Sequence, residues 1–172
     1  SAFTDGVYAD WFNGRSSFDI SSDRWVVLEL ESLRRQPALF RTITLQVLNL
    51  LTRDLYLGDR SIPKLILFDE AHTFLSGAAT GQIKKTIEEG YRKARKHLGA
   101  IYIITQSLTD IGEFGPVGQV ISDNSEFHFY LESTAFERAR QQKIIDPGDF
   151  EMEILKSIRS SKGNYSEIFV KS

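Results

Sequence analysis

The apolar run from Leu65 to Phe68 leads directly into two acids, Asp69 and Glu70, and this feature most restricts how the chain can fold. Consecutive apolar residues bounded by polar ones are typical of a short buried strand. Such a strand has no structural need to end on adjacent carboxylates, because two like charges at one point repel each other. The pattern therefore indicates a site at the carboxyl end of the strand that requires negative charge. The alternative is a strand followed by a helix cap, since Asp is also a common N-cap.

Strand-like and helix-like segments alternate along the chain, which is the pattern of a parallel sheet with right-handed crossovers. Strands are expected where apolar and β-branched residues run together, over residues 25–30, 64–68, 100–105, 126–131 and 166–170. Helices are expected over residues 37–56, 82–98, 135–143 and 146–158. Loops are expected over residues 1–23, 76–81 and 112–118. With 172 residues and no internal repeat, residues 1–172 are expected to form a single α/β domain.

Polar side chains follow two of the expected strands. Asp69 and Glu70 follow residues 64–68, and Gln106 follows residues 100–105, a continuous apolar run of the kind buried on both faces. In parallel sheets these carboxyl ends face the ligand crevice. The segment resembles the Walker B segment of P-loop NTPases, in which the aspartate, here Asp69, would hold Mg²⁺ through its water shell and the glutamate, here Glu70, would orient and polarise the attacking water. Gln106 can donate to a phosphate oxygen and accept from water, which suits a sensor of nucleotide state.

Basic residues gather near the C-terminal end of the helix expected over 82–98. Arg92 and Arg95 are candidates for an arginine that acts across a subunit interface and stabilises the charge of a transferred phosphate. The alternative is that they complement the helix dipole on a solvated face. Arg138 and Arg140, on a later helix, are secondary candidates for the same role.

Composition excludes several classes of protein. Lys and Arg total 21 against 23 Asp and Glu, so net charge does not support a nucleic-acid partner, although it leaves one open. Cysteine is absent, which excludes a disulfide framework and a thiolate metal site. No segment reaches the roughly 20 apolar residues of a transmembrane helix. Residues 1–10 carry no basic residue and do not form a secretory signal.

A phosphate-binding motif is missing from the sequence. P-loop enzymes hold the phosphates with Gly-x-x-x-x-Gly-Lys-Ser/Thr, and no segment matches that pattern. Residues 112–118 are glycine-rich but lack the Lys-Ser/Thr pair. The chain thus has the metal and water side of a nucleotide-hydrolysing site without the phosphate side.

Three segments in this order, residues 65–72, 87–96 and 103–107, resemble the C-terminal part of TraC-like ATPases of type IV secretion (conjugative transfer) systems. Residues 8–15, 25–31 and 159–168 are similar as well. This family belongs to the FtsK/HerA-like branch of RecA-type P-loop ATPases. The resemblance implies a RecA-like three-layer sandwich with a mostly parallel sheet. It assigns the Walker B roles to Asp69 and Glu70 and the sensor role to Gln106.

The resemblance also implies ATP and Mg²⁺ as cofactors and a homo-oligomer, in this family a hexameric ring. That ring would lie at the cytoplasmic face of the bacterial inner membrane, with inner-membrane components of the secretion system as partners. Its role would be pilus assembly and substrate transfer. In the family the Walker A segment lies upstream, so we expect the chain to be the C-terminal part of a longer protein.

The missing Walker A strand has a structural consequence. In RecA-type sheets it lies between the strands expected here at 100–105 and 126–131. Without it, these two strands either close the gap or leave unpaired edges, and unpaired edges and apolar surface favour self-association. We therefore expect the 172-residue chain alone to be less stable than the longer protein and to lack ATPase activity.

Three other classes share parts of this pattern. Residues 69–72 match the DEAH-box of helicases, but those enzymes are expected to continue with Ser-Ala-Thr where residues 105–107 are Thr-Gln-Ser. An FtsK-like translocase or a conjugative coupling protein, both of which pump DNA, would share Asp69, Glu70 and Gln106. A non-catalytic structural subunit of the secretion apparatus would use these surfaces only for assembly, and the presence of both acids and Gln106 argues against it.

Overall fold

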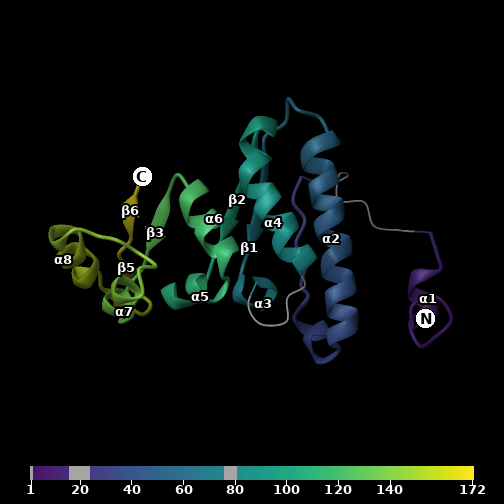
Figure 1. The fold of residues 1–172 in the computed structure, drawn as a ribbon, viewed down its shortest axis with the longest axis horizontal. Helices are drawn as coiled ribbons and strands as arrows, with labels where there is room; N and C mark the ends of the chain where they lie inside the picture. Colours follow the sequence, from purple (N-terminus) through teal and green to yellow (C-terminus); the bar gives the residue numbers. More distant parts are fainter. Residues whose placement is uncertain (1, 16–23, 76–80) are drawn as a thin grey trace.

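Two parallel strands lie at the centre of the computed structural model, which describes residues 2–15, 24–75 and 81–172 (Figure 1). They are β1 (Lys64–Phe68) and β2 (Gly99–Ile103), paired in register from Lys64 opposite Gly99 to Phe68 opposite Ile103. Both strands lie where the sequence predicts them. The pair is connected through α3 (His72–Leu75), α4 (Gly81–Lys93) and the 3₁₀ helix η2 (Ala94–His97). The predicted loop over 76–81 lies outside the described residues except for Gly81, which begins α4.

The long helix α2 (Pro37–Leu57) lies where the sequence predicts a helix, and it packs beside α4. It begins with Pro37 in its first turn, where the missing N–H costs nothing, and Gly58 follows its end. The predicted second helix ends earlier than expected, because α4 gives way to η2 at Ala94. Leu98, and not Gly99, takes the left-handed conformation that ends this segment, with φ 51°.

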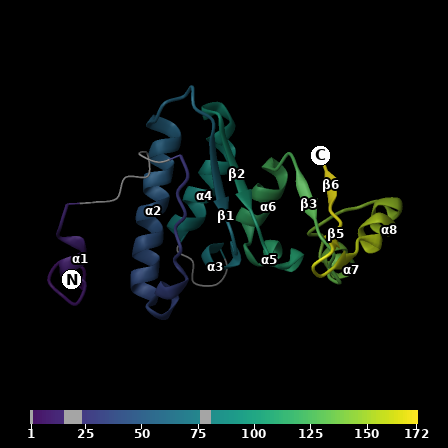
Figure 2. The same cartoon turned by 180° about the vertical axis from the view of Figure 1, so that it is seen from behind.

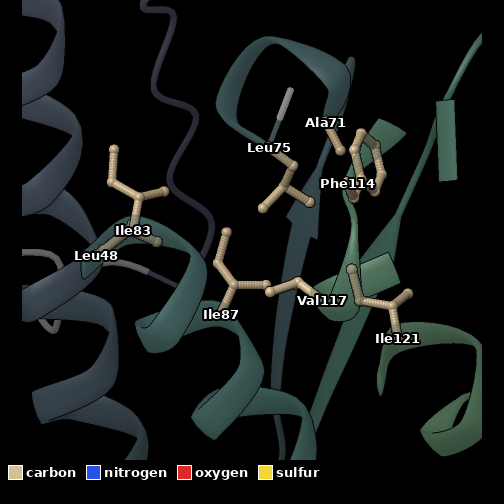
Figure 3. Packing of buried hydrophobic residues seen from close by; sticks show 8 residues of the cluster. All are labelled: Leu48, Ala71, Leu75, Ile83, Ile87, Phe114, Val117 and Ile121. Carbon is tan, nitrogen blue, oxygen red and sulfur yellow. The ribbon is translucent and has the colours of Figure 1, made fainter. Parts of the chain in front are cut away.

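The main hydrophobic core lies between the helices and one face of the β1–β2 pair (Figure 3). Its buried members are Leu48, Ala71, Leu75, Ile83, Ile87, Phe114, Val117 and Ile121. Gly90 allows α4 to approach the sheet, since a Cβ at this position would lie 2.9 Å from Cδ1 of Ile101. Within the same core, burial raises the pKa of Tyr91 well above its ordinary value of 10.0.

Two helices occupy the region around residues 112–118, where the sequence predicts a loop. They are α5 (Leu108–Glu113) and α6 (Pro116–Asn124). Ser107 caps α5 in a capping box with Asp110, and Pro116 occupies the first turn of α6. Gly118 allows the two short helices to pack closely, since a Cβ at this position would lie 2.1 Å from the carbonyl oxygen of Ile111 in α5. Val117 and Ile121 of α6 belong to the main core.

The C-terminal region has its own small core. The strand β3 (His128–Tyr130) pairs antiparallel with β6 (Phe169–Lys171), and β4 (Ser160–Ser161) with β5 (Tyr165–Ser166). The helices α7 (Phe136–Gln141) and α8 (Asp149–Ser157) contribute Phe136, Met152 and Leu155 to this core. The last helix starts two residues after Pro147, later than the sequence predicts.

One predicted strand is absent. Residues 24–30 form neither a helix nor a strand, and Trp25 and Val27 are largely exposed. These residues are rich in β-branched and apolar side chains, but they do not pair with any strand in the described part of the chain. Propensity alone therefore does not form a strand here. The 3₁₀ helix η1 (Glu31–Arg35) follows, and a short helix α1 (Ala9–Phe12) lies near the N-terminus, where a loop was predicted.

The sheet is smaller than the resemblance implies. Within the described ranges, β1–β2 is the one parallel pair, and it is not hydrogen-bonded to the β3–β6 pair. The strands β2 and β3 therefore leave unpaired edges, the second of the two outcomes expected for a missing strand. The rings of Tyr102 and Phe129, one from each strand, have centroids 6.4 Å apart. The protein is thus α/β, and the described residues do not form a mostly parallel sheet of three layers.

The face of β1–β2 turned away from α4 is open (Figure 2). Side chains alternate along both strands, so that half of the apolar residues point away from the helices. Leu65 is 58% exposed and Leu67 52%. Tyr102 of β2 pairs with Leu67, and both Tyr102 and Ile104, the residue after β2, are exposed as well. The prediction that β2 is buried on both faces is therefore wrong.

None of the helices in the described part of the chain combines the length and apolarity that crossing a membrane requires.

Candidate functional site

The predicted polar residues meet at the carboxyl edge of the β1–β2 pair. Parallel pairing continues past the strands, since Ile104 N donates to Phe68 O at 2.9 Å and Ala71 N donates to Ile104 O at 3.0 Å. These two bonds bring the turn after β1 against the segment after β2. Asp69, Glu70 and Gln106 therefore lie at one edge, as the sequence predicts.

Glu70 occupies a tight turn with an unusual backbone conformation. Its φ is 48°, in the left-handed region, which costs a non-glycine residue about 1–3 kcal/mol. The Oδ1 of Asp69 accepts the Glu70 N–H at 2.8 Å, and Glu70 O accepts the Thr73 N–H at 2.9 Å. Ala71, the next residue, is fully packed into the main core. The core thus anchors a turn that directs the Glu70 side chain outward from the end of β1.

Gln106 is held between two fixed points. Ile104 on one side is bonded to Phe68, and Ser107 on the other caps α5. Thr105 Oγ1 also donates to Ser107 O at 3.1 Å across Gln106. The amide side chain extends from this short rigid segment, and its Nε2 donates to Oε1 of Glu70 at 3.0 Å. The predicted sensor and the predicted catalytic acid are therefore in direct contact.

A second donor reaches Glu70 from a distant part of the chain. Arg34, in η1, donates from Nη2 to Oε2 of Glu70 at 3.0 Å, and their side chains are 39% and 44% exposed. Each carboxylate oxygen of Glu70 thus accepts from a different side chain. Sequence reasoning missed Arg34. No clear signal for it is present in the sequence, because Arg34 lies four positions after Leu30 and residues 25–30 form no strand.

Asp69 is exposed and beside Glu70. A carboxylate with a free side suits Mg²⁺, which keeps several waters and binds one or two carboxylates together with substrate phosphates. A cage of three or more His, Cys, Asp or Glu side chains does not occur among residues 2–15, 24–75 and 81–172. Asp69 therefore has the chemistry that the predicted role of holding Mg²⁺ through water requires.

The two candidate arginines lie elsewhere. Arg92, at the end of α4, donates from Nε and Nη2 to Glu88 at 3.2 and 3.1 Å, one helical turn away. Arg95, in η2, is exposed. Both precede the amino end of β2, whereas Glu70 and Gln106 follow the carboxyl ends of the strands. Within one chain they do not join the site, and action across a subunit interface stays a prediction.

Comparison with known proteins gives one family and one relative. The family described as the TraG P-loop domain matches residues 1–172. Protein TraC of Escherichia coli (strain K12) is 28% identical over 141 residues, which are 81% of this chain and 16% of that protein. The chain thus spans a small part of the length of this relative. No solved structure matches.

Proposed function

The chain belongs to the TraG P-loop domain family, and from this premise we propose that it forms the Walker B and sensor side of an ATP-hydrolysing motor in conjugative transfer. The similarity to Protein TraC supports placement in a conjugative transfer system. One observation carries the catalytic part of the proposal. Glu70, two residues after the end of β1, is oriented by Gln106 from the segment after β2, and Asp69 lies beside it.

The residues have distinct roles in this proposal. Bound ATP would supply the phosphorus centre that is attacked. The Mg²⁺ bound with it would neutralise the charge that develops on the phosphate oxygens. Asp69 would hold the water shell of the ion. A carboxylate oxygen of Glu70 would accept a hydrogen bond from the attacking water, orient it and take its proton. Gln106, bonded to Glu70, would sense the γ-phosphate through the same amide group.

The phosphate side of the site lies outside this sequence in our proposal. The chain covers 16% of its relative Protein TraC and has no Gly-x-x-x-x-Gly-Lys-Ser/Thr motif. We infer that an upstream part of a longer protein provides that motif, and that it covers the open face of β1–β2 to give the three-layer fold. Parallel sheets are normally covered on both faces, which supports this arrangement.

The proposal extends to the assembly. A hexameric ring associated with the inner membrane, with Arg92 or Arg95 acting on the neighbouring subunit's nucleotide, follows from the family resemblance. The exposure of both arginines is compatible with such an interface.

The test is ATP turnover by the full-length protein that contains this chain. Glu70→Gln keeps the shape of the side chain but removes the proton acceptor, and we expect a loss of about 10²–10⁴ in kcat. Glu113→Gln makes the same chemical change at an exposed position in α5 and is expected to leave kcat unchanged. Wild-type turnover that survives Glu70→Gln would contradict the assigned role. An oligomeric full-length protein without turnover would favour a structural subunit.

A further inference from the structure

The contact between Arg34 and Glu70 is not used by the roles described above. Arg34 precedes Glu70 by 36 positions, and the two residues belong to different elements. The turn of η1 is closed by Leu33 N donating to Leu30 O at 3.0 Å and Gln36 N donating to Leu33 O at 2.9 Å. It leads directly into α2, which packs on α4 and carries the buried core residue Leu48. The core therefore fixes the base from which Arg34 reaches the site.

Stability does not account for this contact. Both side chains are about two-fifths exposed, and ion pairs of this kind contribute about 0.2–1 kcal/mol to folding. The left-handed φ of Glu70 costs at least as much. The backbone of Glu70 is strained, and two donors hold its side chain. This combination indicates that the local structure serves to position the carboxylate and not to stabilise the fold.

The geometry of the two donors fixes the orientation of the carboxylate. Gln106 alone would hold Oε1 but leave the group free to rotate about that bond. Arg34 holds Oε2, so the plane of the carboxylate is defined by donors from two separate segments. Each oxygen keeps a second lone pair, and the carboxylate can still accept from a water.

We propose that Arg34 is a positioning residue for Glu70, and that ATP turnover depends on it whereas nucleotide binding does not. This inference rests on the proposed function. Arg34 acts on the attacking water through Glu70 and has no contact with the nucleotide in this account. A misplacement of about 1 Å at a reacting group costs about 10²-fold in rate, which sets the expected size of the effect.

The experiment compares four variants of the full-length protein by steady-state ATP hydrolysis. For Arg34→Ala we expect kcat to fall about 10²-fold with KM unchanged within about threefold. We expect Arg34→Lys to have a kcat between those of Arg34→Ala and the wild type. An ammonium group can reach one carboxylate oxygen but lacks the fixed fork of a guanidinium. Arg35→Ala removes the neighbouring arginine of the same turn and is the matched control, expected to hydrolyse at the wild-type rate. Glu70→Gln is measured in parallel.

A double variant separates positioning from a general structural effect. If Arg34 acts through Glu70, Arg34→Ala added to Glu70→Gln slows turnover no further than Glu70→Gln alone. The thermal midpoint of Arg34→Ala is expected to match that of Arg35→Ala, which excludes misfolding as the cause.

The outcomes separate the role of Arg34 from the proposed function. Wild-type kcat in Arg34→Ala, alongside an inactive Glu70→Gln, overturns the role of Arg34 and leaves the proposed function intact. Additive losses in the double variant, or equal losses of kcat and nucleotide affinity, also overturn it. A wild-type protein without ATP turnover overturns both claims.

Discussion

The two faces of the β1–β2 pair are both apolar, but the described residues cover only one of them. On the covered face, Phe68 and Ile103 pack against the main core beneath α4 and α6. On the open face, Leu65 and Leu67 are more than half exposed, and Tyr102 lies beside them. The residues alternate between the faces with the same apolar character. The difference shows that an apolar pattern alone does not bury a face, because the described residues pack on one side of the pair and leave the other exposed.

The largest expected effect is a contrast in stability between the faces. Phe114 is completely buried in the main core, and Phe114→Ala is expected to lower the free energy of unfolding by about 3–5 kcal/mol. Leu67→Ala, on the open face, is expected to change it by less than about 0.5 kcal/mol. Urea unfolding of the 172-residue chain measures both. Similar losses at the two positions would show that the open face is covered in solution.

Self-association gives the next largest contrast. Leu65→Ser with Leu67→Ser removes apolar area from the open face, and burial of one leucine contributes about 1.5–3 kcal/mol. We therefore expect association of the chain to weaken at least about tenfold in sedimentation velocity. Leu57→Ser, at the exposed end of α2, is the control. If that control weakens association as much as the double variant does, the open face is not the contact surface.

A smaller effect on the covered face concerns pH. Burial raises the pKa of Tyr91 in the folded chain, so above about pH 10 the unfolded chain loses this proton while the folded chain keeps it. The stabilisation is fully present below that pH and is lost as pH rises through the folded pKa. Tyr91→Phe has no such proton, and its unfolding free energy is expected to fall less steeply between pH 9 and 11. Identical slopes for the two chains would contradict this burial.

The strands and helices with strong patterns were predictable from sequence. The apolar run before Asp69 and the helical spacing after Pro37 identify β1 and α2 closely. The segment at 25–30 has the same composition as a strand but no partner edge, so tertiary context overrides its propensity. The glycines of residues 112–118 predict a loop, but this region forms parts of α5 and α6, where Gly118 permits close packing between the two helices.

The candidate site was partly predictable for a related reason. Asp69, Glu70 and Gln106 follow predicted strands, and the rule for parallel sheets places them at one edge. Arg34 follows a segment that forms no strand, so the same rule did not extend to it. Its contact with Glu70 depends on how η1 and α2 pack, which residue spacing does not encode. The positions of Arg92 and Arg95 relative to a neighbouring subunit also lie beyond the sequence of one chain.

The most direct test of the central claim compares ATP turnover by the 172-residue chain with turnover by the full-length protein at equal concentration. If this chain holds the carboxylate side of a site whose phosphate side lies elsewhere, the full-length protein hydrolyses ATP and the chain alone does not. Magnesium-dependent turnover by the chain alone, lost in Glu70→Gln, would contradict the account, because the 172 residues would then contain a complete site.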